Sequence, residues 1–334
     1  MLAGLLVGAL TSAVCAWGLR LWARRRRIVQ KVGAPLVGQD RHLPPVGGLA
    51  LAIGCAAGAC VWSLQSGMRW TEQSMGVVGA GAVILLVGLI DDFVRELSPW
   101  QKLLGQCLAW WLLVRGGIVA QIVMMPPWAN LLISLIWTLA IINALNLLDI
   151  ADGLAVGIGL IATGTFLILS LLAGQLGVAG LLAGVCGALA GILAFNFPRA
   201  TLFLGDSGSM LLGLLLAACA LAVSYAPLGR EVALVTPLVV LGLPMYDLAF
   251  VMLARTRNGR SVWKKSQDHF VLRLMRQGRS PTNAALAMFG LCLAFSCAAL
   301  VISRTSNLVG LITLSAVAAA SLRWGARLAR VPIG

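Results

Sequence analysis

The sequence predicts an all-α polytopic membrane protein, a bundle of about 11 transmembrane helices. Of its 334 residues, 60% are hydrophobic and only 11% are charged, and the mean hydropathy is +0.95. Soluble domains are typically about one quarter charged. Apolar runs of about 20 residues recur along the chain, and this length is what crosses the hydrocarbon core of a bilayer. We therefore expect one integral membrane domain covering residues 1–334.

Charged residues, glycine and proline separate the apolar runs and delimit the expected helices. The first run is expected to be retained, because its basic cluster, Arg24–Arg27, follows the apolar stretch, whereas a cleaved signal peptide has the opposite order. The predicted spans are 2–22, 47–66, 76–90, 103–118, 128–147, 154–173, 176–195, 209–227, 232–254, 284–303 and 307–322.

The distribution of basic residues predicts the orientation of the bundle. If the N-terminus lies outside, all but four of the 25 Lys and Arg residues fall in inner segments; the exceptions are Arg69, Arg115, Arg230 and Arg304. Inner loops of membrane proteins carry such an excess of basic residues. We therefore expect an outer N-terminus and a cytoplasmic C-terminus. The net charge of +14 is explained by this bias, and with no nucleic-acid motif in the chain we expect no nucleic-acid partner.

Five carboxylates lie within a few residues of the predicted inner ends of apolar spans. A charge at the centre of a bilayer costs roughly 2.5–3.5 kcal/mol on insertion scales, and even near the interface it needs a partner or a wet cleft. Helix capping explains one or two such residues. Five on one face predict a functional site, formed by Asp91, Asp92, Asp149, Asp152 and Asp206.

The stretch "LIDDFVRELSPWQKLLGQ" (89–106) places two adjacent aspartates before a lysine. Adjacent like charges repel each other unless a cation neutralises them. Mg²⁺ prefers oxygen ligands and is usually held by one or two carboxylates together with substrate phosphates, so we expect Mg²⁺ here, with Mn²⁺ as an alternative. Lys102 can supply a point charge to a phosphate.

Two further stretches complete the expected inner-face site. In "NALNLLDIADGLA" (143–155), Asn146, Asp149 and Asp152 are spaced by three, which places them roughly on one helical face. Such a set can help to hold a metal or can read a nucleobase or sugar hydroxyls. In "NFPRATLFLGDSGS" (196–209), "GDSGS" is expected to precede the eighth span, where backbone N–H groups can face a phosphate. Asp206 would repel that phosphate unless a metal lay between them.

Two loops carry the two histidines of the chain. The basic segment 255–280 contains His269. This segment is expected to interact either with the anionic lipid surface or with an anionic substrate. The stretch "QDRHLPPVGG" (39–48) is interpreted as a structural turn, with substrate contact by Arg41 and His42 as the alternative. The residues alone thus predict a phosphate-bearing cytoplasmic substrate that meets a lipid at the membrane surface.

Together, "LIDDFVRELSPWQKLLGQ", "NALNLLDIADGLA" and "NFPRATLFLGDSGS" resemble the motifs of the polyprenyl-phosphate N-acetylhexosamine-1-phosphate transferases, glycosyltransferase family 4. The resemblance covers residues 40–282 and is nearest to the O-antigen and teichoic-acid-initiating type, which is related to the peptidoglycan lipid I translocase. It implies transfer of a sugar-1-phosphate from a UDP-N-acetylhexosamine donor to polyprenyl (undecaprenyl) phosphate, giving a polyprenyl-diphosphate-sugar and UMP. It also implies a bacterial inner (plasma) membrane location with the site on the cytoplasmic face.

The resemblance implies roles for individual residues. Asp206 and Asn146 would ligate Mg²⁺, Asp91 would be the base that prepares the lipid phosphate, and Asp92 would support it. A covalent phospho-enzyme is the alternative that the family leaves open. The residues expected to hold substrate are Lys102, Asn146, Asp149, Asp152, Asn196, Phe203 and His269.

Three positions depart from the family pattern. Ile150 stands where the family has a glycine, and Val271 and Leu272 stand where it has two further histidines after His269. The two absent histidines argue against the lipid I translocase. They also motivate a non-catalytic scaffold as an alternative. A transporter is a further alternative, although transporters usually place such carboxylates near the bilayer midplane. The sequence leaves the oligomeric state open, and a homodimer is one of the alternatives.

Overall fold

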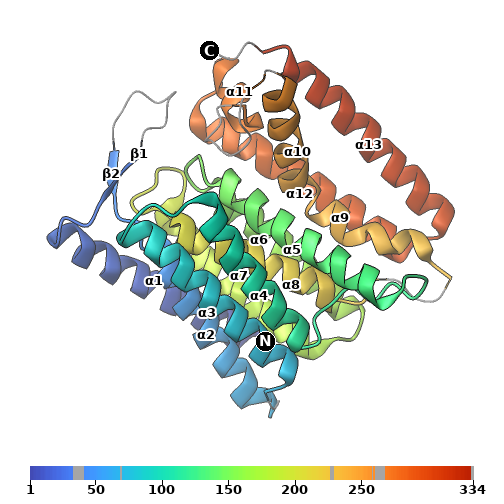
Figure 1. The fold of residues 1–334 in the computed structure, drawn as a ribbon, viewed down its shortest axis with the longest axis horizontal. Coiled ribbons are helices and arrows are strands. Elements are labelled where there is room, and N and C mark those ends of the chain that lie inside the picture. The colour runs from blue at the N-terminus through green and yellow to red at the C-terminus, as the bar shows by residue number, and fades with distance from the viewer. Residues whose placement is uncertain (33–40, 68–69, 226–228, 258, 260–267, 332–334) are drawn as a thin grey trace.

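The computed structural model describes residues 1–32, 41–67, 70–225, 229–257, 259 and 268–331. Helices dominate this part of the chain, which confirms the predicted all-α polytopic class. Within the described residues, nine helices are long and apolar enough to cross a membrane, or ten if one bent pair forms a single span. Figure 1 shows them packed side by side in a slanted bundle, with the termini at different ends.

The helices follow the predicted order, with one short hairpin between the first two. The elements are α1 (Leu2–Arg25), β1 (Gln30–Val32), β2 (Arg41–Leu43), α2 (Gly47–Ser66), α3 (Glu72–Phe93), α4 (Pro99–Arg115), α5 (Pro127–Leu148), α6 (Leu154–Leu172), α7 (Leu176–Asn196), α8 (Gly205–Ala222), η1 (Glu231–Val235), α9 (Thr236–Val240), α10 (Gly242–Arg257), α11 (Phe270–Arg276), α12 (Pro281–Arg304) and α13 (Asn307–Ala329). The strands β1 and β2 pair antiparallel. Neither the hairpin nor α11 was predicted.

Every predicted span overlaps one of these helices, and the boundaries differ for local reasons. The helix α3 begins at Glu72 because Thr71 and Ser74 form a capping box. Ser98 and Gln101 form a second capping box, and Pro99 occupies the first position of α4, where its missing N–H is not needed. With 17 residues, α4 is shorter than the helices counted as spans. The number of spans and the sides of the two termini stay predictions.

The ninth predicted span, 232–254, is broken. The segment 231–240 and α10 are bent by 69° relative to each other. Pro244 lies in the first turn after the break and has no backbone N–H to donate to the carbonyl of Val240. Sharp kinks in helices usually have such a proline as their cause.

The helix α8 forms the centre of the bundle and positions the site. Most of its side chains are buried, from Ser207 to Ala220. It packs against α3 on one side and α5 on the other. On the α5 side, Gly213 allows the backbones to approach, because an added Cβ would lie 2.6 Å from Cα of Ile142. Small residues at such contacts are typical of membrane helix bundles.

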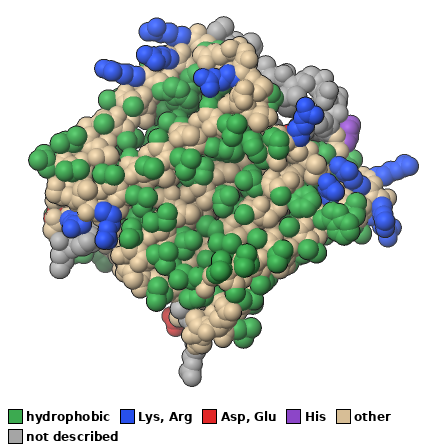
Figure 2. All heavy atoms as spheres, turned by 180° about the vertical axis from the view of Figure 1, so that it is seen from behind, with side chains coloured by type: hydrophobic (Ala, Val, Ile, Leu, Met, Phe, Trp, Pro, Cys, Tyr) green, Lys and Arg blue, Asp and Glu red, His purple; other side chains and the backbone are tan. Residues whose placement is uncertain are grey.

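The outer surface is apolar over a broad area. Large hydrophobic side chains such as Leu86, Ile136 and Ile312 are each 60% exposed. In Figure 2, hydrophobic side chains cover the middle of the visible face, and Lys and Arg gather at its edges. An exposed apolar surface of this extent is expected of a protein whose solvent is lipid. The protein is therefore an integral membrane protein.

Candidate active site

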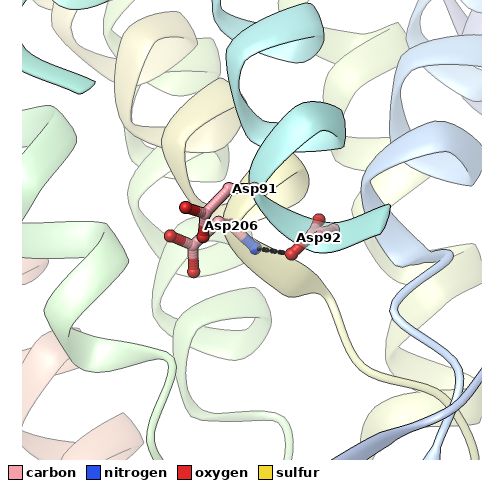
Figure 3. A group of neighbouring side chains, drawn as sticks. All are labelled: Asp91, Asp92 and Asp206. Atoms are coloured by element: carbon pink, nitrogen blue, oxygen red, sulfur yellow. Dashed lines mark hydrogen bonds between the residues drawn. The ribbon is translucent and has the colours of Figure 1, made fainter. Parts of the chain in front are cut away.

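Three of the predicted carboxylates meet where the end of α3 touches the start of α8. Asp91, Asp92 and Asp206 each offer an oxygen within 4.8 Å of the other two. In Figure 3, the carboxylates of Asp91 and Asp206 lie close together, whereas Asp92 points to the other side of the start of α8. Asp206 follows Asp92 by 114 positions in the chain, so the fold brings distant residues into one cluster. The Asp91 side and the Asp92 side of this cluster have different surroundings.

Two glycines make this junction possible. A Cβ on Gly88 of α3 would collide with the backbone of Ser207, so the two helices touch through the glycine. Gly205 has a φ of +75°, which L-residues rarely adopt, and an added Cβ would lie 2.6 Å from Oδ2 of Asp92. The glycine of "GDSGS" is therefore required both by its backbone conformation and by the adjacent carboxylate.

Asp92 caps α8 from the neighbouring helix. Its Oδ1 accepts the backbone N–H of Asp206 at 2.9 Å, and its Oδ2 accepts the N–H and the hydroxyl of Ser207 at 3.0 and 2.6 Å. The first N–H groups of a helix have no partner within it, and a carboxylate there also interacts favourably with the helix dipole. "GDSGS" is therefore the first turn of α8. The expectation that its N–H groups face a phosphate is wrong for Asp206 and Ser207.

Asp91 and Asp206 share a lysine on the other side of the junction. Oδ2 of Asp91 accepts a hydrogen bond from Nζ of Lys102 at 2.8 Å, and the same ammonium also contacts Oδ2 of Asp206. Oδ1 of Asp91 accepts the backbone N–H of Leu97 at 2.6 Å. The side chain of Asp206 is 31% exposed, against 11% for Asp91. Asp206 is therefore the more accessible of the two carboxylates.

Asn146 reaches the same cluster from the last turn of α5. Its Nδ2 donates to Oγ of Ser209 at 2.9 Å, and that hydroxyl donates to the carbonyl of Gly205 at 2.9 Å. Asn146 also lies within hydrogen-bonding reach of Asp206. The predicted grouping of this amide with the carboxylates is therefore seen in the structure.

The chemistry of these side chains fits a divalent cation. Carboxylate oxygens are the ligands that Mg²⁺ and Mn²⁺ prefer, and the cluster already accommodates a positive charge between Asp91 and Asp206. The oxygens of Asp92 are committed to the start of α8. The residue best placed to hold a cation is therefore Asp206, the more exposed of the two carboxylates, with Asn146 and Asp91 beside it.

Asp149 lies directly after α5, in the loop that leads to α6. Burial raises the pKa of its carboxyl from the ordinary 3.8 to about 8. The negative charges of Asp206, Asp92 and Asp152 act in the same direction, and the backbone N–H of Gly205 opposes them. These causes place Asp149 next to the acidic cluster, as the sequence predicted.

This shift of Asp149 predicts a pH dependence of stability. A group whose pKa is raised by folding binds more protons in the folded state, so its contribution is fully present below about pH 4 and is lost as the pH rises through about 8. We expect the melting temperature of the chelator-treated protein to fall over this window, and Asp149→Asn to remove that component. The difference between the two melting curves is the measurement. Parallel curves would contradict the shift.

Asp152 and Asn196 connect two loops. Oδ2 of Asp152 accepts the N–H of Ala200 at 3.0 Å. Asn196 is 2% exposed; its Oδ1 accepts the N–H of Gly153 at 3.0 Å and its Nδ2 donates to the carbonyl of Leu202 at 2.9 Å. The prediction that Asn196 contacts substrate is therefore wrong, because both ends of its amide bind other parts of the protein. Its amide instead holds the loop at Gly153 against Leu202.

Phe203 and the "PPVGG" turn are also paired. The N–H of Phe203 donates to the carbonyl of Pro44 at 3.0 Å, and its carbonyl accepts the N–H of Gly47 at 2.9 Å. The predicted structural role of this turn is thus observed. The side chain of Phe203 is half-buried, and His42 is exposed on β2. Residues 39 and 40, which begin the stretch 39–48, lie outside the described residues.

His269 is buried rather than open to solvent. It is 1% exposed, and its Nδ1 forms a 2.6 Å hydrogen bond with Oδ2 of Asp247 on α10. Oδ1 of the same aspartate accepts the N–H of Phe270 at 2.8 Å. The sequence reading assigned no role to Asp247. A carboxylate inside an apolar run was the signal that could have found it, because such residues need a partner.

The three departures from the family pattern meet in one apolar cluster. Val271 and Leu272 are 0% and 4% exposed and pack with Leu148 and Leu154, the residues that flank the loop between α5 and α6. Ile150, in that loop, packs against the same cluster. The three side chains that depart from the family pattern therefore contribute to one apolar cluster.

The carboxylates and the lysine at the joined ends of α3 and α8 fit the class of membrane-embedded enzymes. Residues 74–224 match the model of glycosyl transferase family 4. A Bacillus subtilis protein named "Probable undecaprenyl-phosphate N-acetylglucosaminyl 1-phosphate transferase" is 31% identical over 297 residues, which cover 84% of this chain and 80% of that protein. The chain belongs to glycosyl transferase family 4, a family of phospho-sugar transferases.

Two other relatives show the range of the family. The decaprenyl-phosphate N-acetylglucosaminephosphotransferase of Mycobacterium tuberculosis is 32% identical over 305 residues, covering 79% of this chain and 74% of that protein. The phospho-N-acetylmuramoyl-pentapeptide-transferase of Limosilactobacillus fermentum is 30% identical over 255 residues, covering 70% and 75%. Both names describe the transfer of a phosphorylated N-acetyl sugar.

Proposed function

We propose that this protein transfers N-acetylhexosamine 1-phosphate from a UDP-sugar to a polyprenyl phosphate and so initiates a cell-envelope glycan. The observation that carries the proposal is the pair Asp91 and Asp206 with Lys102 between them, at the joined ends of α3 and α8. The activities in the names of the Bacillus and Mycobacterium relatives support it. The site would face the cytoplasm at the bacterial inner membrane, in line with the basic residues of the predicted inner segments.

The residues would divide the work as follows. Asp206 would hold a divalent cation, with Asn146 and Asp91 beside it. When bound, that cation would neutralise the charge of the diphosphate. Lys102 would offer its ammonium to a phosphate oxygen. Asp91, anchored by Leu97 and Lys102, would accept a proton from the lipid phosphate.

The proposed transfer is a phosphoryl displacement, in which one bond to phosphorus forms and another breaks. An oxygen of the polyprenyl phosphate attacks the sugar-bearing phosphorus of the UDP-sugar. The bond from that phosphorus to the bridging oxygen of UMP breaks, and UMP leaves with the bonding electrons. The product is a polyprenyl-diphosphate-sugar. Little covalent chemistry is left to the protein in such a step, so positioning and charge neutralisation dominate. A two-step route through a covalent phospho-carboxylate is the alternative.

A second candidate function is the formation of lipid I. The Limosilactobacillus relative, which is named phospho-N-acetylmuramoyl-pentapeptide-transferase, favours it. The aliphatic cluster around Val271 and Leu272 argues against it, because those positions carry histidines in the family pattern. A non-catalytic or transporter-like relative would show no turnover with any donor. A homodimer remains a prediction.

One assay tests these possibilities. Purified protein in detergent receives undecaprenyl phosphate, a divalent cation and a panel of UDP-N-acetylhexosamine donors, including UDP-N-acetylmuramoyl-pentapeptide. We expect UMP release with a UDP-N-acetylhexosamine, dependent on the cation and on the lipid. Release with the muramoyl-pentapeptide donor alone would select the second candidate. No release from protein that melts cooperatively would reject the transferase.

A further inference from the structure

Arg273 is a buried arginine with an extensive set of partners. It lies in α11, four residues after His269, and is 1% exposed. Its Nε donates to the carbonyl of Asp268 at 3.1 Å, and its Nη2 donates to Oδ1 of the same residue at 3.2 Å. The guanidinium also lies 5.0 Å from the ring centroid of Phe250, a favourable cation–π arrangement. A buried charge is retained only when it is paired and hydrogen-bonded in this way.

The remaining side of the guanidinium reaches the end of the last helix. Nη1 donates to the carbonyls of Leu328 and Val331, each at 2.9 Å, with the carbonyl of Ala329 at 3.5 Å. The last carbonyls of a helix have no partner within it and carry partial negative charge. Arg273 therefore acts as a C-terminal cap of α13, supplied from a helix more than 50 residues earlier in the chain.

Aromatic packing fixes the same end of α13. The ring of Trp324 lies 4.6 Å from that of Phe270, and the hydroxyl of Tyr246 donates to the carbonyl of Ser321 at 2.7 Å. Gly325 makes room for Tyr246, because an added Cβ would collide with its hydroxyl. Elsewhere α13 buries little: its main other contacts are with α12 and η1, and in Figure 1 its C-terminal end lies near α10 and α11.

We infer that residues 321–331, which we call the C-terminal clamp, help to hold α11 and therefore His269 in place. Arg273 is the positioning residue that links the clamp to α11. His269 immediately precedes α11, and Asp247 binds both its ring and the N–H of Phe270. The placement of α11 therefore sets the placement of the imidazole. The inference rests on the proposed function and extends it to His269, the residue that the resemblance to the family assigns to substrate binding.

The test compares Arg273→Met with Arg327→Met. Methionine keeps an unbranched apolar stem but removes the guanidinium. Arg327 is the matched control because it lies in the same segment, but its side chain is exposed and takes no part in the contacts described above that tie this segment to α10 and α11. Backbone hydrogen exchange is followed at 268–276, at 321–331 and at the carboxylate junction, 88–93 and 205–210. For Arg273→Met we expect about tenfold faster exchange in the first two segments and an unchanged junction. We expect Arg327→Met to match the wild type.

The same variants are assayed for turnover. By analogy with the outer partners of metal-binding histidines, we expect Arg273→Met to raise the donor KM about tenfold and to change kcat much less. Gly325→Ala, which separates the clamp from Tyr246 without touching Arg273, should give the same pattern and serves if Arg273→Met does not fold. Exchange at 268–276 equal to that of Arg327→Met would overturn the inference.

Kinetics distinguish this inference from the proposed function. Faster exchange with a donor KM unchanged in both Arg273→Met and His269→Ala would overturn the donor role of His269 and with it the role of the clamp, while turnover at the acidic site would stand. Absence of turnover in the wild type would overturn the proposed function, and the exchange measurement would then still report whether Arg273 holds α11.

Discussion

Asp206→Asn is expected to lower turnover by at least about 10³-fold, the size of effect seen when a group that stabilises developing charge is removed. The carboxylate of Asp206 is the most exposed member of the cluster and shares Lys102 with Asp91. An amide keeps the shape of the side chain but supplies neither the charge for a cation nor the charged partner for the ammonium. Initial rates of UMP release from matched amounts of protein measure the loss.

The folded protein should tolerate the same change. Removing one of two neighbouring carboxylates relieves repulsion, and the backbone N–H of Asp206 keeps its bond to Asp92. We expect a melting temperature close to that of the wild type and weaker binding of Mn²⁺, measured by titration calorimetry. Glu96→Gln is the matched control, since Glu96 is an exposed acid shortly after α3. Turnover within tenfold of wild type for Asp206→Asn would remove Asp206 from the proposed chemistry.

The sequence predicted well what hydropathy and charge determine. The lengths of the apolar runs located the helices. The carboxylates near the predicted inner ends of these runs led to Asp91, Asp149 and Asp206, which the fold brings together. Those features are local, because each helix must satisfy its own backbone within lipid. The break before α10 was missed, although Pro244 marks it.

What the sequence could not predict is which atoms each polar side chain engages. Asn196 was expected to contact substrate, but its amide joins Gly153 to Leu202. Asp152 likewise binds the N–H of Ala200. Motif spacing identifies residues that matter at a site, yet it does not separate those that touch a ligand from those that shape the loops around it. That distinction depends on contacts between segments about 50 residues apart.

The pair Asp91 and Asp92 shows the same limit at its sharpest. The two residues are adjacent and chemically identical, but in a helix successive side chains point in different directions. Asp91 faces Lys102, and Asp92 faces the start of α8. The role expected for Asp92, support of a catalytic base, is thus better described as support of the helix that carries Asp206.

Asp92→Ala is therefore expected to reduce stability and turnover together. The change leaves the N–H groups of Asp206 and Ser207 and the hydroxyl of Ser207 without their acceptor in a buried junction. A buried donor that loses its partner costs about 1–3 kcal/mol, so the free energy of unfolding should fall by about 3 kcal/mol or more. For a chain of 334 residues, with an unfolding entropy of about 2.1 cal/mol/K per residue, that corresponds to roughly 4 °C in melting temperature.

Ser207→Ala provides the internal comparison, because it removes only the hydroxyl and leaves both N–H groups bound to Asp92. Its loss of melting temperature should be a fraction of that of Asp92→Ala, and its turnover should remain near wild type. If Asp92→Ala melted like the wild type and yet had no turnover, Asp92 would belong to the chemistry and not to the cap. Melting and turnover measured on the same preparations therefore separate the two neighbouring aspartates: loss of turnover alone marks Asp206 as a reacting group, and joint loss marks Asp92 as the residue that holds α8 in place.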